Sequence, residues 1–263
     1  KREGRYYVKR NSSALIAFSI PSSFSGFNIV SAHTDSPCFK VKWNPEVKAA
    51  GFPTRLNVEA YGGMIMQSWF DRPLSIAGRV FIKRNGKVEE KLVNLGQKFT
   101  IVIPNLAIHQ NREANNGWKI SVQKEMLPIF SDGESSFLDE VASSAECRKE
   151  DLLDYDLFLY NKTAPVFWGA EGEFFSSPKI DDLGCAWTAL EALKTSEPKD
   201  KIAMCALFDN EETGSGTKQG ALSDFLLSVT ERIMENLGMG VEDKYITYAG
   251  SRMISADNGH AVH

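Results

Sequence analysis

A buried-looking apolar run, residues 202–208, leads directly into the carboxylates Asp209, Glu211 and Glu212 and then into a Thr-Gly-Ser-Gly stretch. Neighbouring carboxylates repel each other, and one that is desolvated alone favours its protonated form. The cluster is therefore either a solvated turn or a site for a cation. Adjacent carboxylates point in different directions, so one of Glu211 and Glu212 can bind a metal while the other faces a substrate and moves protons.

Further side chains of this kind lie at the ends of other segments. His33 and Asp35 close a β-branched run, Asp181 and Asp182 precede a helical pattern, and Asp257 follows a third apolar run. Each motif alone also fits a surface loop, a helix N-terminus or a turn. If these side chains converge, an imidazole with several carboxylates suits Zn²⁺, Mn²⁺ or Co²⁺. A pair of ions bridged by a carboxylate would then neutralise the charge of the acidic cluster.

The elements that must position these residues can be read from the apolar pattern. Residues 27–36, 202–212 and 252–260 are short apolar runs closed by polar residues, which is typical of buried parallel strands whose carboxyl ends hold ligands. Residues 179–195 carry apolar side chains at helical spacing, with Asp181 or Asp182 placed to cap the helix. These segments predict an α/β domain with a mostly parallel sheet and flanking helices.

The middle of the chain has a different pattern. Residues 58–63, 74–93 and 98–103 are strand-like, and Asn85-Gly86 within the second stretch is a strong hairpin signal. Residues 139–163 are expected to form one helix followed by a strand. The middle therefore predicts an antiparallel β-rich unit inserted into the α/β domain.

The expected domains follow from this change of pattern. They are an α/β domain formed by residues 1–45 and 172–263, and an inserted β-rich unit formed by residues 46–171.

Composition narrows the function classes. The chain has 263 residues and a net charge of -4, which argues against a nucleic-acid or membrane-surface partner. Its apolar runs are too short to span a bilayer, and no signal-peptide pattern opens it, although it starts at Lys1. The four cysteines form no CxxC pair, which favours a reduced, cytoplasmic setting.

Seven stretches together suggest a family. They are SAHTDSPCFKVK (31–42), YGG (61–63), WFDRPLSIAGRV (69–80), IPNLAIH (103–109), KIDDL (179–183), FDNEETGS (208–215) and ISADNGHAVH (254–263). In this order they resemble the signature stretches of the aspartyl aminopeptidase family of dinuclear zinc metallopeptidases. The resemblance runs along nearly the whole chain.

The resemblance implies a role for each candidate residue. His33 and Asp257 would bind one metal ion, Asp181 would bridge two ions, and Glu212 would bind the second ion. Glu211 would be the general base, and Asp35 would orient His33. The family usually has Asn where this chain has Asp182, so which of the two acids forms the bridge stays open.

Two further histidines are candidates by the same resemblance. His109 belongs to the β-rich unit and is assigned in the family either to metal binding or to the substrate pocket of a neighbouring subunit. We favour substrate contact, because His109 lies outside the sheet that carries the other ligands. His260 is a second pocket candidate. Asn105 stands where many relatives have His, so any role of that side chain is lost or altered.

The implied activity is removal of N-terminal residues, acidic or neutral, from peptides by a metal-activated water. The ions are expected to be Zn²⁺, with Co²⁺ or Mn²⁺ as alternatives, and the β-rich unit is expected to form dimers that assemble into a dodecamer. Relatives supply a further histidine ligand beyond this last motif. Without it the second ion would be under-coordinated, as in a truncated chain or an inactive copy.

Two other functions fit the same residues. One is a different metal-dependent amide hydrolase, such as a carboxypeptidase or deacylase, and the other is a non-catalytic assembly subunit on the peptidase fold. Cleavage of N-blocked peptides would favour the first, and normal oligomers without metal-dependent turnover would favour the second.

Overall fold

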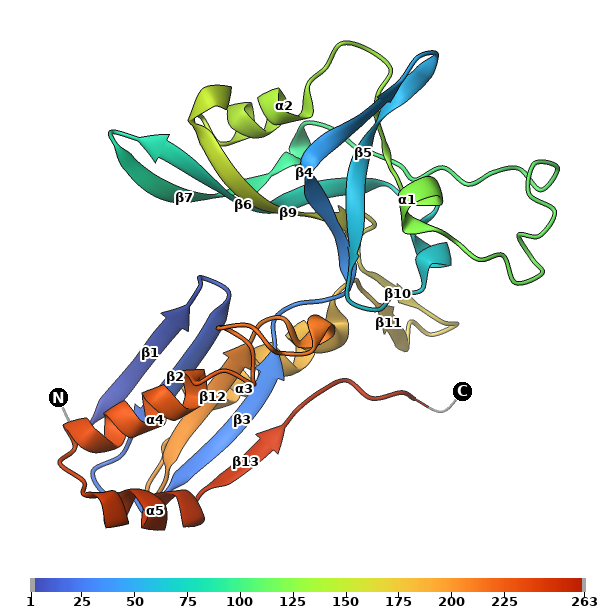
Figure 1. The fold of residues 1–263 in the computed structure, drawn as a ribbon. Coiled ribbons are helices and arrows are strands. Elements are labelled where there is room, and N and C mark those ends of the chain that lie inside the picture. Colours follow the sequence, from blue (N-terminus) through green and yellow to red (C-terminus); the bar gives the residue numbers. More distant parts are fainter. Residues whose placement is uncertain (1–2, 262–263) are drawn as a thin grey trace. The chain divides into compact units, whose positions relative to one another are not determined.

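The computed structural model describes residues 3–261 and divides the chain into two compact units (Figure 1). One unit consists of Lys1–Ser36 and Lys179–His263, and the other consists of Pro37–Pro178. The units divide after residues 36 and 178, whereas the sequence pattern predicted boundaries after residues 45 and 171. We call the first the split unit and the second the β-rich unit.

The split unit is built on a five-stranded sheet in the order β1-β2-β12-β3-β13. Its strands are β1 (Gly4–Arg10), β2 (Ala14–Ile20), β3 (Phe27–His33), β12 (Ile202–Phe208) and β13 (Arg252–Ser255). The last three coincide with the predicted apolar runs. They are mutually parallel, with β3 in the middle, so their carboxyl ends meet at one edge of the sheet.

The expectation of a mostly parallel sheet is wrong. Strand β1 pairs antiparallel with β2, and β2 pairs antiparallel with β12, so the sheet is mixed. For β1 and β2 the reason is the short connection between them, where Asn11 and Ser12 adopt φ values of 55° and 54°. A connection of this length returns the chain antiparallel, whereas a parallel neighbour needs a long crossover.

Helices cover both faces of this sheet. They are α3 (Ile180–Thr195), α4 (Phe225–Asn236) and α5 (Val241–Ala249), and a 3₁₀ turn, η4, spans Glu211–Thr213. Alternate residues of β12 point to opposite faces: Met204 packs in the cluster that contains Phe225 of α4, while Cys205 packs in the cluster that contains Ala186 of α3. The predicted helix at 179–195 is therefore present, and it packs against the sheet through small side chains.

The β-rich unit contains a six-stranded antiparallel sheet in the order β7-β6-β9-β4-β5-β8 and a separate two-stranded sheet. Its strands are β4 (Cys38–Ala49), β5 (Phe52–Tyr61), β6 (Leu74–Arg84), β7 (Lys87–Asn94), β8 (Ile129–Ser131), β9 (Leu152–Asn161), β10 (Val166–Trp168) and β11 (Phe174–Ser176). Its helices are α1 (Val122–Glu125) and α2 (Phe137–Ser144), with 3₁₀ turns η1 (Met66–Trp69), η2 (Leu95–Gln97) and η3 (Lys149–Asp151).

Local sequence explains part of this unit. Asn85 and Gly86 take φ values of 51° and 74° in the two-residue turn between β6 and β7, as the hairpin signal predicts. The expected helix and strand within 139–163 correspond to α2 and β9. Residues 98–103, in contrast, form only isolated bridges, through Ile101, Val102 and Ile103.

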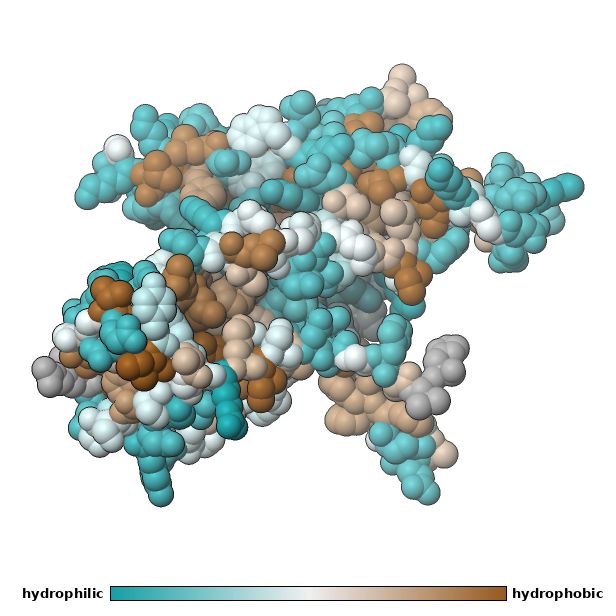
Figure 2. Space-filling view, turned by 60° about the horizontal axis from the view of Figure 1, so that its bottom comes forward, coloured by the Kyte–Doolittle hydropathy of each residue, from teal (hydrophilic) through white to brown (hydrophobic). Residues whose placement is uncertain are grey.

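Many apolar side chains remain on the surface, and Figure 2 shows them as brown patches between hydrophilic residues. The hairpin of β10 and β11 is one example, with Phe167 73% exposed and its ring 5.2 Å from that of Phe175. A second ring pair, Trp168 and Phe174, stacks at 4.5 Å. No helix among residues 3–261 combines the length and the apolar character needed to cross a membrane.

An ion-pair network lies on the sheet of the β-rich unit. Arg79 donates two hydrogen bonds to Oδ2 of Asp156, at 3.1 and 2.9 Å, and Lys40 donates to Oδ1 at 2.8 Å. Burial favours the neutral carboxyl, but the hydrogen bonds and charges of Lys40 and Arg79 outweigh it and lower the pKa of Asp156. A carboxyl group whose pKa is lower in the folded state stabilises the fold at pH values above its unfolded-state pKa. This stabilisation is lost as pH falls through the folded-state pKa.

We therefore expect Asp156→Asn to lower the free energy of unfolding by about 1–2 kcal/mol at pH 7, because it removes the charged acceptor that Lys40 and Arg79 share. The difference from the wild type should shrink as pH falls from the ordinary aspartate pKa of 3.8 through the lower folded-state pKa, below which both proteins carry a neutral group at this position. Urea titrations at a series of pH values measure both effects. As a control, Glu146→Gln removes the exposed ion pair with Lys91 and should change the free energy of unfolding little. A difference between Asp156→Asn and the wild type that stays constant at all pH values would contradict the expectation.

Candidate metal centre

The site is created by the carboxyl ends of the parallel strands in the split unit. His33 is the last residue of β3 and is directly paired with Phe208 at the end of β12. Beyond Phe208 lies the acidic turn, and β13 pairs with β3 as far as Ser255, two residues before Asp257. Residues separated by more than two hundred positions thus meet at one edge of the sheet.

His33 is the centre of the cluster and is buried, with 5% of its surface exposed. Its Nδ1 lies 3.1 Å from the backbone oxygen of Asp35 and 3.4 Å from Oδ1 of the same residue. Its Nε2 lies 3.2 Å from Oδ1 of Asp181 and 3.8 Å from Oδ1 of Asp257. Because Nδ1 faces acceptors of Asp35, we assign the proton to Nδ1, which leaves the lone pair of Nε2 for an ion.

Asp35 connects His33 to the acidic turn. Its Oδ1 accepts the backbone N–H of Glu211 at 3.1 Å, and its Oδ2 accepts that of Glu212 at 3.2 Å. The same carboxylate therefore lies against the imidazole, at 3.4 Å from Nδ1, and accepts hydrogen bonds from the backbone on which both glutamates stand. The contact with His33 agrees with the orienting role implied by the resemblance, and that role stays a prediction. The second contact is one that sequence reasoning missed.

The turn that carries the glutamates has a local explanation. Asn210 takes a left-handed conformation with φ of 62°, which Asn tolerates better than most residues. Its side-chain oxygen accepts hydrogen bonds from Thr217 and Gln219, both at 2.7 Å. Gly214 ends η4 with φ of 93°, where a side chain would be strained. Asp209, the third acid of the cluster, instead accepts the N–H of Asn210.

The start of α3 presents two acids in different ways. Asp181 and Asp182 have non-helical backbone angles and are joined by a cis peptide bond. The side chain of Asp181 is 54% exposed and points its Oδ1 at Nε2 of His33, whereas Asp182 is fully buried.

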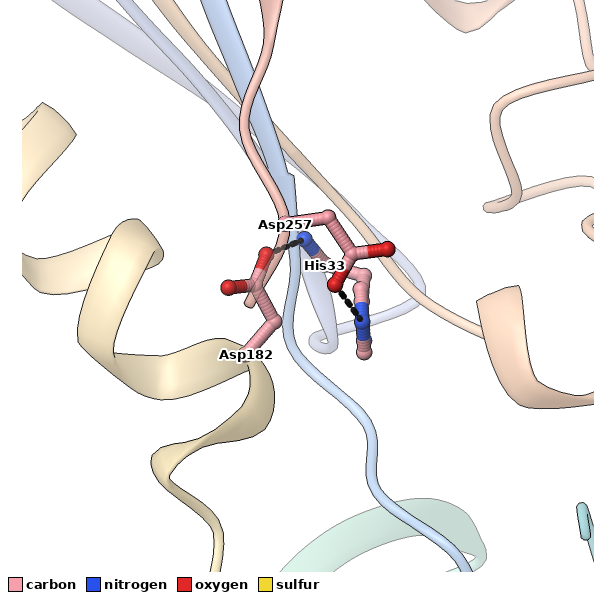
Figure 3. A group of neighbouring side chains, drawn as sticks. All are labelled: His33, Asp182 and Asp257. Carbon is pink, nitrogen blue, oxygen red and sulfur yellow. Dashed lines mark hydrogen bonds and ion pairs between the residues drawn. The ribbon is translucent and has the colours of Figure 1, made fainter. Parts of the chain in front are cut away.

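Distance alone would make Asp182 a ligand, because it offers an oxygen within 4.8 Å of atoms of His33 and Asp257 (Figure 3). Its oxygens, however, accept hydrogen bonds from the protein: Oδ2 accepts the backbone N–H of His33 at 3.1 Å, and Oδ1 accepts the side chain of Asn258 at 2.9 Å. Asp181 is therefore the acid that geometry favours as a ligand, and Asp182 supports the backbone behind it.

Glu211 and Glu212 form a second group of possible ligands with His33. His33, Glu211 and Glu212 each offer a ligand atom within 4.8 Å of the others. Burial, followed by the charge of Glu211, raises the pKa of Glu212 to about 7. Burial and then the charge of Asp257 raise the pKa of Asp181 as well. A divalent cation would offset these costs, so the donor set, one imidazole with several carboxylates, fits zinc.

The two histidines assigned to the substrate pocket are both exposed. His109 is exposed and belongs to the β-rich unit, in a turn beyond Pro104. His260 is exposed, three residues after Asp257. Their roles stay predictions. Besides the hydrogen bonds of Asp35 to the acidic turn, sequence reasoning missed Asn258 and Cys185, which both form hydrogen bonds with Asp182. The position of Asn258 directly after Asp257 was the signal that could have identified it.

An α/β unit whose sheet edge gathers an imidazole and carboxylates is suited to metal-dependent hydrolysis. The model of the aminopeptidase I zinc metalloprotease family, M18, matches residues 1–263, so the chain belongs to this family and the resemblance is confirmed.

Curated relatives have related sequences. A probable M18 family aminopeptidase 2 from Clostridium acetobutylicum is 44% identical, over 100% of this chain and 63% of the relative. A protein described in the same words from Clostridium novyi is 41% identical, over 98% of this chain and 62% of the relative. The chain thus spans somewhat less than two thirds of the length of these curated relatives.

Solved structures are similar as well. The cryo-EM structure of the Ape4 and Nbr1 complex contains a chain that is 33% identical with a TM-score of 0.90, covering 100% of this chain and 56% of that one. The structure of the Saccharomyces cerevisiae mApe1 dodecamer is 26% identical with a TM-score of 0.84, covering 100% of this chain and 62% of that one.

Replacing His33 by Ala removes the central imidazole, so we expect a loss of zinc affinity greater than the roughly 10–100-fold that outer partners of a metal ligand cost. Metal content after dialysis against buffered zinc, measured by mass spectrometry, reports the loss. His109→Ala is the control and should retain its metal if His109 contacts substrate. Equal zinc content in the wild type and His33→Ala would remove His33 from the site.

Proposed function

We propose that this protein is a metal-dependent aminopeptidase that removes N-terminal residues, acidic or neutral, from peptides. One observation carries the proposal: His33 has Asp181 and Asp257 at its Nε2, while Glu211 and Glu212 offer oxygens within 4.8 Å of the same residue. Membership of the zinc metalloprotease family supports this reading.

In this proposal the chain holds two zinc ions. His33 and Asp257 would hold one ion, Asp181 would bridge both, and Glu212 would hold the other. When bound, the ions would supply Lewis acidity, which lowers the pKa of water and polarises a scissile carbonyl. The resemblance implies that a further histidine completes the coordination of the second ion.

Glu211 is the proposed general base. It stands beside Glu212 in η4, its backbone N–H is held by Asp35, and its side chain is the more exposed of the two. A carboxylate held in this way can take a proton from the attacking water and pass it to the leaving amine. Asp35, bonded to both the imidazole and the turn, keeps the distance between His33 and Glu211 constant.

Self-association is part of the proposal. The β-rich unit would be the dimerisation module, and dimers would assemble into a dodecamer, the state named for the yeast protein mApe1. The exposed aromatic hairpin of β10 and β11 supports an interaction surface in this unit, because exposed apolar patches commonly mark interfaces. The cytoplasmic location expected from the cysteines remains a prediction.

Replacing Glu211 by Gln should lower kcat by at least about 100-fold, because the amide cannot accept the proton, while zinc content stays at the wild-type level. Glu212→Gln is the matched control one residue away, and it should lose zinc together with activity. Turnover of aminoacyl chromogenic substrates and metal analysis on the same samples separate the two roles. Wild-type turnover by Glu211→Gln would show that another group is the base.

The same assay distinguishes the alternative hydrolases. A peptide with a free amino terminus and its N-acetylated counterpart are compared with the wild type. Cleavage of the free peptide alone is expected, whereas cleavage of the blocked peptide would indicate a deacylase or another amide hydrolase.

A further inference from the structure

The side chain of Asn258 joins two segments that are far apart in the sequence. Its Nδ2 donates to Oδ1 of Asp182 at 2.9 Å and to the backbone oxygen of Ile180 at 3.1 Å. Asn258 directly follows Asp257, and Ile180 and Asp182 flank Asp181. One amide therefore ties together the two backbone segments that carry two of the candidate ligands.

Asp182 is the buried end of this connection. It is 0% exposed, and its Oδ2 accepts the backbone N–H of His33 at 3.1 Å. A hydrogen bond to Asp182, together with burial, raises the pKa of Cys185 to about 11, so this residue is a thiol that can donate. A buried carboxylate needs such donors, because leaving it without them is costly. His33, Cys185 and Asn258 are thus all anchored to one buried group.

The anchoring matters because the ligands repel each other. Asp181 and Asp257 both point an oxygen at Nε2 of His33, at 3.2 and 3.8 Å. Without a restraint, two like charges would separate before an ion arrives. A lysine or arginine could restrain them, but it would also pair with the carboxylates that the ion needs. The neutral amide of Asn258 restrains the backbone without competing for the ligands.

We propose that Asn258 is a positioning residue of the metal centre. By its hydrogen bond to Asp182 it holds Asp257 and Asp181 beside Nε2 of His33, and so it sets the affinity for the ion that these residues bind. The inference rests on the proposed function only in requiring that an ion binds there.

The test is Asn258→Leu in the whole gene product, because leucine has a similar size and lacks the donor. Zinc affinity, measured by competition with a chromophoric chelator, should fall by roughly 10–100-fold, the usual effect of an outer partner of a metal ligand. The visible spectrum of the Co²⁺-loaded protein should change as the ligand geometry loosens.

Asn236→Leu is the matched control. This exposed asparagine also donates through Nδ2 to a backbone oxygen, that of Arg232 at 2.7 Å, at the end of α4. It should leave zinc affinity and the Co²⁺ spectrum unchanged. The melting temperatures of the metal-free variants should differ from the wild type by similar amounts, which separates positioning from general destabilisation.

Exchanging the two side chains provides a rescue. In the double variant Asp182→Asn with Asn258→Asp, the amide oxygen at 182 can still accept from His33 while its NH₂ donates to the new carboxylate at 258. Zinc affinity should exceed that of Asn258→Asp alone, which has likewise lost the hydrogen bond to the backbone oxygen of Ile180. A double variant no better than Asn258→Asp would overturn the proposal, even if Asn258→Leu binds weakly.

The outcomes also separate this inference from the proposed function. Wild-type zinc affinity and an unchanged Co²⁺ spectrum in Asn258→Leu would overturn the positioning role alone. A wild-type protein that binds no zinc would overturn the metal centre itself, and the positioning role with it.

Discussion

The crowding of like charges around one buried imidazole is the constraint on which the rest of the site depends. The carboxylates that surround His33 raise its pKa despite its burial, and burial beside Glu211 raises the pKa of Glu212 to about 7. Such a cluster is stable only if hydrogen-bond donors or a cation compensate it. The protein supplies backbone N–H groups to Asp35 and Asp182. It leaves Asp181 and Asp257 facing Nε2, which is where a divalent ion would satisfy them.

The sheet brings these charged side chains together through the regular geometry of its strands. Because β12, β3 and β13 run parallel and in register, their carboxyl ends deliver the acidic turn, His33 and Asp257 to one edge. Helix α3 adds Asp181 and Asp182 from its first turn. The strands are held by apolar clusters on both faces, and fully burying one aliphatic or aromatic side chain contributes roughly 1.5–3 kcal/mol. Stability thus comes from the core, and the exposed edge is free to carry charge.

The parts of the fold that sequence predicts well are those with local physical signals. Apolar runs closed by polar residues correspond to β3, β12 and β13, and Asn85-Gly86 corresponds to the turn between β6 and β7. The mixed character of the sheet could not be predicted in this way, because whether β2 lies beside β12 depends on long-range pairing. The prediction of a strand at residues 98–103 was wrong for the same reason. Their alternating pattern is typical of a strand, but they form only isolated bridges with other segments.

The amino-acid sequence by itself determined which groups are available for chemistry, His33 and a set of acids at segment ends, and it was sufficient to indicate the family. It left open which of Asp181 and Asp182 would serve as a ligand, since two adjacent aspartates are equivalent in any local pattern. Only the tertiary structure gives the two aspartates different surroundings, and these favour Asp181 as the ligand. The N–H of His33 and the amide of Asn258, both distant in the chain, occupy the oxygens of Asp182 and leave Asp181 facing the imidazole. Hydrogen-bond donors that arrive from other strands decide which charge is buried and which is offered to an ion.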